Sequence, residues 1–259
     1  MSFNKGTVKL ALASVFAAVY VVLSAIPLKV PVIGAPKAKI SLVAFLGPLY
    51  GLILGPVTGF LSAFAGALIA CVTPPGAPDP WGLATTLCPA LAAFTSGCIV
   101  RKRFNGLHGW VAGLIPLAAL TLAWYTTPVG LTAWYYPILQ FSGITLVLAF
   151  RDRIAVMFTG RQSLSPLPVL LAGFPAIVTD HMLGNMLFVF FGHIFFPKLS
   201  RNPGDLAKLF TAVLPISAAE RLTMAALLIV VGTPLIIALR RAGLIYTPQR
   251  VKAEFPLEG

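Results

Sequence analysis

The stretch LPVLLAGFPAIVTDHMLGNMLFVFFGHIF, residues 167–195, is apolar over a length that can cross a lipid bilayer. Asp180 and His181 nevertheless lie near its middle. A charged side chain in the middle of a membrane helix costs roughly 2.5–3.5 kcal/mol on insertion, so it normally faces a cavity or a partner rather than lipid. The stretch therefore predicts a membrane helix with one polar face.

A second apolar stretch has the same character. Residues 214–239, LPISAAERLTMAALLIVVGTPLIIAL, carry Glu220 and Arg221 side by side. Because both stretches need a polar neighbour, the sequence predicts a polar interior among the last helices of the protein.

The composition indicates an integral membrane protein. Of the 259 residues, 58% are hydrophobic and only 10% are charged, and the mean hydropathy is +0.91. A soluble domain usually has about 25% charged residues. This chain has too few to cover the surface of a soluble domain. The formal net charge of +12 does not indicate a nucleic-acid partner, because the basic residues cluster in short loops, where they set topology next to anionic membrane lipid.

We predict an all-α, multi-pass bundle in the cell membrane that forms one domain over residues 1–259. Eight apolar segments can be drawn, which gives six to eight transmembrane helices. The segments are 8–28, 39–54, 56–73, 82–100, 107–127, 132–150, 167–195 and 214–239.

The lysines and arginines indicate the orientation of the bundle. Of the nineteen, twelve fall on the side of the N-terminus, six fall on the opposite side, and Arg221 lies within a span. Since cytoplasmic loops carry the excess of positive charge, we expect both termini to be cytoplasmic.

Aromatic residues gather where the outer interface is expected, and we interpret them as membrane anchors. Trp81, which follows a proline-rich loop, is also a candidate lid over a ligand. Lys39 opens the second span on the outer side, where it either extends to water or meets an anionic ligand. The anchors are Trp81, Trp124, Tyr125, Trp134, Tyr135 and Tyr136.

Glycines recur every four residues in the second and third spans, at 47, 51, 55 and 59. A helix face without side chains allows two backbones to approach closely, so the pattern predicts tight helix packing. Gly55-Pro56 interrupts it and predicts a turn between two short helices.

The polar residues of the last two spans are the candidate substrate-binding site. Asp180, Asn185 and His193 lie in the middle and outer part of one span, and Glu220 and Arg221 lie in the outer part of the other. Neighbouring residues on a helix do not face each other, so we expect Glu220 and Arg221 to have separate partners. Three interpretations stay open: a substrate pocket, an internal ion-pair network such as Asp180 with Arg221, and a proton relay.

Motifs for catalysis and metal binding are missing from the sequence. There is no phosphate-binding loop of the G-x-x-x-x-G-K-[ST] type, no H-E-x-x-H zinc motif and no G-x-S-x-G nucleophile turn. The three histidines fall in different segments, and the three cysteines lie in apolar stretches without metal-ligand spacing. We expect no enzyme activity, no cofactor and no metal site.

Several segments carry a family resemblance. They are the alanine-rich first helix at 10–18, the apolar outer loop at 29–37, the glycine-rich turn at 47–59, and the segments 180–185 and 220–221. Together they resemble the substrate-binding S component of an energy-coupling factor (ECF) transporter. The resemblance implies a small membrane subunit that captures a vitamin, a vitamin precursor or a transition metal ion outside the cell. It also implies docking on a coupling membrane subunit driven by two ATPase subunits.

The resemblance has further implications for single residues. In that family an A-x-x-x-A pattern in the first helix packs against the coupling subunit, and Ala13 and Ala17 fit it; an ordinary alanine-rich packing face is the alternative. The family core has six helices, so an inserted pair at 107–150 would account for the surplus. The metal-binding branch needs a histidine-bearing N-terminal segment, which 1–4 lacks. An organic solute is therefore the expected ligand.

The sequence thus predicts the solute-recognition subunit of an ATP-driven importer. The substrate-binding residues would be Asp180, Asn185, His193, Glu220 and Arg221, with Lys39 and Trp81 at the mouth of the pocket. The forked donors of Arg221 would suit a carboxylate or a phosphate on the ligand. The alternatives are a self-sufficient secondary transporter with Asp180 and Glu220 as proton carriers, and a membrane-embedded enzyme that uses Asp180, His181 and Glu220.

Overall fold

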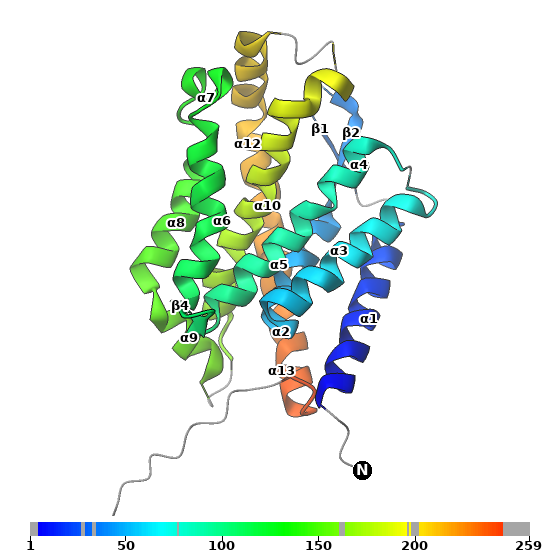
Figure 1. Ribbon diagram of the computed structural model, residues 1–259, viewed down its shortest axis with the longest axis vertical. Helices are drawn as coiled ribbons and strands as arrows, with labels where there is room; N and C mark the ends of the chain where they lie inside the picture. Colours follow the sequence, from blue (N-terminus) through cyan, green and yellow to red (C-terminus); the bar gives the residue numbers. More distant parts are fainter. Residues whose placement is uncertain are drawn as a thin grey trace, which may run out of the picture.

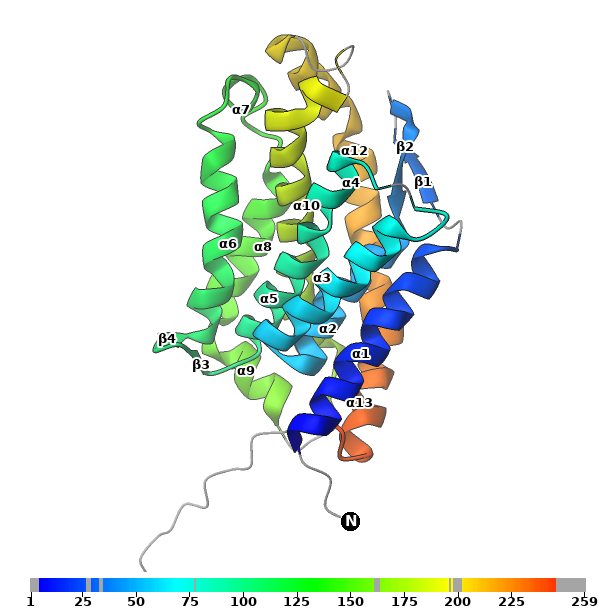
Figure 2. The same ribbon diagram turned by 45° about the vertical axis from the view of Figure 1, so that its right-hand side comes forward.

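The computed structural model describes residues 5–26, 29–32, 35–76, 78–160, 164–195, 197 and 202–245. Over these residues the chain is an elongated bundle of helices with two short hairpins attached, so the expected all-α class is confirmed (Figure 1 and Figure 2). The helices are α1 (Lys5–Ser24), η1 (Leu42–Phe45), α2 (Leu46–Leu54), α3 (Pro56–Val72), α4 (Pro80–Thr85), α5 (Leu87–Ile99), α6 (Gly109–Trp124), α7 (Pro128–Thr132), α8 (Ile138–Phe150), α9 (Asp152–Thr159), α10 (Pro166–Phe195), α12 (Pro203–Leu227), η2 (Leu228–Gly232) and α13 (Thr233–Arg241). The strands are β1 (Lys29–Val32), β2 (Ala35–Ser41), β3 (Arg103–Phe104) and β4 (Leu107–His108).

Four helical stretches in the described residues are long and apolar enough to cross a membrane. Shorter apolar helices occupy the remaining predicted segments. The long stretches are Gly6–Ser24, Pro80–Ile99, Pro166–Phe195 and Pro203–Arg241, and the short ones are Val43–Leu54, Pro56–Val72, Gly109–Trp124 and Ile138–Phe150.

The second predicted helix begins later than the sequence pattern indicated. Residues 35–41 form strand β2, which pairs antiparallel with β1, and the α-helix begins only at Leu46 after one 3₁₀ turn. Pairing with β1 satisfies backbone groups that a helix would otherwise satisfy. Lys39 therefore lies on β2, opposite Pro31, instead of opening a helix; its side chain is outside the described part of the structure.

The last long helix begins earlier than predicted, at Pro203 instead of residue 214. Asn202 caps it, since its Oδ1 accepts a hydrogen bond of 2.8 Å from the backbone N–H of Gly204, and Pro203 occupies the first helical position. Asparagine followed by proline is a helix-start signal that the sequence contained. The helix then continues through the π-helical turn η2 into α13.

The glycine pattern brings α2 close to both of its neighbours. A Cβ added at Gly47 would lie 2.6 Å from the carbonyl oxygen of Pro89 on α5, and one at Gly59 would lie 2.8 Å from the carbonyl oxygen of Tyr50 on α2. Gly55 turns the chain between α2 and α3 with a φ of +82°. The predicted tight packing and the turn are both confirmed.

Two of the predicted membrane anchors belong to the interior instead. Trp124 and Tyr136 are 0% and 1% exposed and lie in a second core cluster with Phe210. Trp134 is 65% exposed, as an anchor at the interface should be. The anchor interpretation was wrong for Trp124 and Tyr136, because helix α12 extends far enough to cover them, which the predicted start at residue 214 had not allowed.

We predict that Arg240→Ala loosens the end of the bundle near the N-terminus. Arg240 Nη2 donates a 2.6 Å hydrogen bond to the carbonyl oxygen of Phe158, and its guanidinium lies 4.6 Å from the centre of the Phe158 ring. Losing both contacts should lower the free energy of unfolding by about 1.5–3 kcal/mol. Hydrogen exchange should show faster opening of α9. Arg241→Ala, at an exposed neighbouring position, is the control; equal protection of α9 in the two variants would contradict this role.

Candidate functional site

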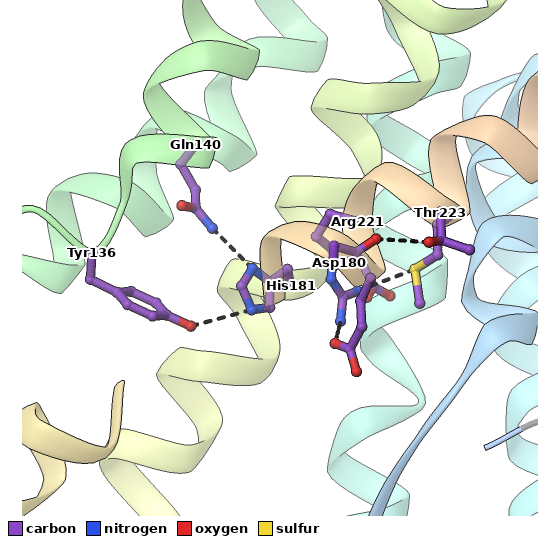
Figure 3. Close-up of polar contacts among 9 residues, drawn as sticks. Tyr136, Gln140, Asp180, His181, Arg221 and Thr223 are labelled. Atoms are coloured by element: carbon purple, nitrogen blue, oxygen red, sulfur yellow. Dashed lines mark hydrogen bonds and ion pairs between the residues drawn. The ribbon is translucent and has the colours of Figure 1, made fainter. Parts of the chain in front are cut away.

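Three buried charged side chains meet between α10 and α12 (Figure 3). Asp180, Glu220 and Arg221 are 8%, 4% and 3% exposed. Arg221 Nη1 lies 3.5 Å from Asp180 Oδ2, and Arg221 Nη2 lies 3.5 Å from Glu220 Oε2. One guanidinium thus pairs with two carboxylates. The ion pair between Asp180 and Arg221, one of the three interpretations of the sequence, is present.

The expectation of separate partners for Glu220 and Arg221 was wrong. Their side chains begin on different faces of α12, but the long arginine side chain bends so that Nη2 reaches the neighbouring carboxylate. Arg221 Nη1 also donates to Met224 Sδ at 3.4 Å. The head group of Arg221 is therefore engaged on both of its terminal nitrogens.

His181 belongs to a second polar group on the other side of α10 (Figure 3). Its Nε2 lies 3.3 Å from Tyr136 Oη, and its Nδ1 lies 3.4 Å from Gln140 Nε2. With the Gln140 amide nitrogen facing the ring, Nδ1 accepts and Nε2–H donates to Tyr136. Gln140 thus joins α8 to α10.

Several buried polar atoms around these groups have no hydrogen-bond partner among the described residues. Each such atom in an apolar interior costs about 1–3 kcal/mol, and buried polar atoms without partners are rare. Their concentration at one place indicates a site that something else completes. The atoms are Asp180 Oδ1, Glu220 Oε1, Arg221 Nε, Asn185 Nδ2 and Gln140 Oε1.

Buried aromatic rings pack around Tyr136 beside the His181 group. Tyr136 stacks on Trp124, with the ring centres 5.1 Å apart. Phe210 packs edge-on against Tyr136 at 4.9 Å. Sequence reasoning did not assign Tyr136 or Phe210 to the site, and no local sequence signal places them there.

The structure separates the remaining predicted site residues. Trp81 lies in the first turn of α4 and packs against the rings of Phe188 and Phe195 at the far end of α10, at 5.9 and 6.0 Å. His193 is exposed in the last turn of α10 and, thirteen residues on, lies about 20 Å along the helix from Asp180. Neither residue contacts the charged group in the described part of the structure, whereas Asn185 is half-buried one turn away from it.

A cleft of about 310 Å³ opens where α1, α3 and α4 meet. The ends of these helices that line it lie at the end of the bundle that carries the β1–β2 hairpin, as the course of the ribbon in Figure 2 shows. Small and hydroxyl side chains such as Ser24, Ala67 and Thr86 line it. Tyr20 also lines the cleft, whereas Asp180, Glu220 and Arg221 do not.

Ala13 and Ala17 face α3 within the chain. The hydroxyl of Ser62 donates a 2.7 Å hydrogen bond to the carbonyl oxygen of Ala13, and a Cβ at Gly66 would lie 3.0 Å from the carbonyl oxygen of Ala17. This close contact between α1 and α3 is the arrangement that an alanine-rich packing face produces.

The described residues contain no group of three or more His, Cys, Asp or Glu side chains that could hold a metal ion. Residues 8–236 match the family described as "ECF transporter, substrate-specific component". A protein of Methanocaldococcus jannaschii, itself described as uncharacterized, is 28% identical over 198 residues, which cover 76% of this chain and 60% of that protein. No solved structure matches the chain.

Proposed function

Because this chain belongs to the family of substrate-specific components of ECF transporters, we propose that it captures a small organic solute at the outer face of the membrane. Members of the family bind small-molecule substrates and work with a coupling membrane subunit and ATPase subunits. In the proposed cycle this chain supplies recognition, and two ATPase subunits supply the energy through the coupling subunit. The solute would be a vitamin or a precursor of one.

One observation carries the assignment of the binding site. Asp180 and Glu220 each have a buried polar atom without a partner inside the ion-pair network of Arg221. Asn185 and Gln140 have further ones, one turn along α10 and beside His181 respectively. A network that existed only to neutralise its own charges would use these atoms. We propose that the solute binds them, with the apolar and aromatic walls excluding water.

The cleft beside Tyr20 is the proposed approach to these groups. It lies at the end of the bundle that the excess of cytoplasmic Lys and Arg assigns to the outside. Trp81, His193 and Lys39 belong to elements at that same end, where they would meet the solute before it is bound.

Docking on the coupling subunit is proposed to involve α1. Ala17 is buried against α3 and Ala13 is half-buried beside it, so a shift of α1 along α3 would expose them to a partner, and small residues allow such sliding. Leu10 and Val22 of α1 are 69% and 64% exposed and can contact a partner, or lipid, without any shift.

Gentle purification from native membranes tests the proposal. We expect mass spectrometry to find a coupling membrane subunit, two ATPase subunits and a retained small molecule. The isolated chain in liposomes should bind this molecule but not accumulate it under a proton gradient. Uphill accumulation by the isolated chain would instead identify a secondary transporter, with Asp180 and Glu220 as proton carriers.

A further inference from the structure

The buried site holds two carboxyl groups and one guanidinium. Arg221 is the one cation that contacts Asp180 and Glu220 in the described residues, and His181 contacts Tyr136 and Gln140 instead. When both carboxyl groups are ionised, one negative charge is without a partner. An anionic solute would add to this excess inside an apolar interior, where repulsion between like charges is strong.

Three of the five N–H donors of Arg221 have partners. Nη1 is engaged by Asp180 and Met224, Nη2 is engaged by Glu220, and Nε has no partner among the described residues. Bidentate binding of a carboxylate or phosphate needs two parallel N–H donors. Nε–H and one N–H of Nη2 remain for such a group, so the role of Arg221 as an anion receptor stays a prediction, but the two carboxylates beside it would repel an anion.

The atoms that lack partners are mostly acceptors. Asp180 Oδ1, Glu220 Oε1 and Gln140 Oε1 can accept hydrogen bonds, whereas Arg221 Nε and Asn185 Nδ2 can donate. A complementary ligand would bring several N–H donors and a positive charge.

Resting on the proposed function, we infer that the solute carries a cationic nitrogen group, such as an ammonium, an amidinium or a protonated heteroaromatic ring, which binds between Glu220 and Asp180. Asn185 would donate to a neighbouring acceptor on the same molecule. The other species that can neutralise the excess carboxylate is a proton, and it would leave the site without preference for a cation.

Three probes of equal shape and different charge test the inference. The full chain in lipid nanodiscs is heated in the presence of benzamidinium, benzamide or benzoate, and the shift in unfolding temperature is converted to an apparent Kd. We expect benzamidinium to bind about tenfold or more tightly than the other two. Equal or tighter binding of benzoate, or no shift with any probe, would overturn the inference.

Single substitutions show which residue causes the preference for benzamidinium. Glu220→Gln should abolish the preference for benzamidinium, whereas Asp205→Asn should keep it. Asp205 lies on the same helix, but it is exposed and paired with Lys208 at 3.2 Å. The comparison of the three probes on the unaltered chain decides the inference even if Glu220→Gln fails to fold.

The inference and the proposed function fail in different ways. A retained native solute that has a carboxylate or phosphate and no basic nitrogen would overturn the inference and support solute capture. A chain that retains no solute in native membranes and associates with no ATPase subunits would overturn the function itself.

Discussion

Replacing Gly51 by alanine is expected to destabilise the bundle strongly, although it adds only one methyl group. A Cβ at this position would overlap the carbonyl oxygen of Ala93 and the hydroxyl of Ser96 on α5. Ser96 also donates a 2.8 Å hydrogen bond to the carbonyl oxygen of Pro48, which joins α5 to α2 at the same level. The methyl group therefore has to push two backbones apart and weaken this hydrogen bond.

The free energy of unfolding should fall by roughly 3 kcal/mol or more, at the upper end of the range for overpacking. The reason is that the clashing backbone atoms cannot rotate away. The higher helix propensity of alanine, worth about 1 kcal/mol, offsets only part of it. Unfolding by SDS titration in mixed micelles measures the change. Gly160→Ala is the matched control, since its Cβ would meet nothing closer than 3.4 Å. Equal stability of the two variants would show that α2 and α5 are not packed as described.

Arg221→Met is expected to cost about 3–5 kcal/mol of stability, because it leaves Asp180 and Glu220 buried without a cation. Methionine keeps most of the length of the side chain and removes the charge. The measurement is again unfolding in mixed micelles, together with the amount of folded protein. Lys208→Met, on the exposed part of the same helix, removes the same charge and should have little effect.

A neutral triple variant separates the two roles that the charges can have. Asp180→Asn, Glu220→Gln and Arg221→Met together remove every ionic group of the network, and such replacement is often neutral for stability. If the network binds solute, the triple variant should fold but lose solute retention. A variant that folds and still retains solute would show that the charges stabilise only one another, and it would remove the proposed binding site.

Much of the fold was predictable from the sequence because it depends on local properties. Hydropathy over a window of residues identified the helices at 56–73 and 107–127 within a few residues. The hairpin at 29–41 was missed, because strand pairing between neighbouring segments leaves only a weak hydropathy signal in a proline-rich loop. The early start of α12 was missed although Asn202 and Pro203 marked it.

The candidate site was predictable in part. Asp180 and Arg221 were predicted to lie at the site because ionic groups in apolar helices need partners. The two side chains do contact each other. Tyr136 and Gln140 could not be assigned to the same region, because their contacts with His181 join residues more than forty positions apart.

By itself, the sequence determined that this is a helical membrane protein with ionic groups inside it, because the free energy of placing apolar and charged side chains in a bilayer depends on each segment alone. Only the tertiary structure decided that Arg221 pairs with both carboxylates and that each carboxylate keeps one oxygen without a partner in the described part of the chain. It also decided that Ala13 and Ala17 face α3. These features depend on which helix faces lie together, and that choice follows from packing of the whole chain.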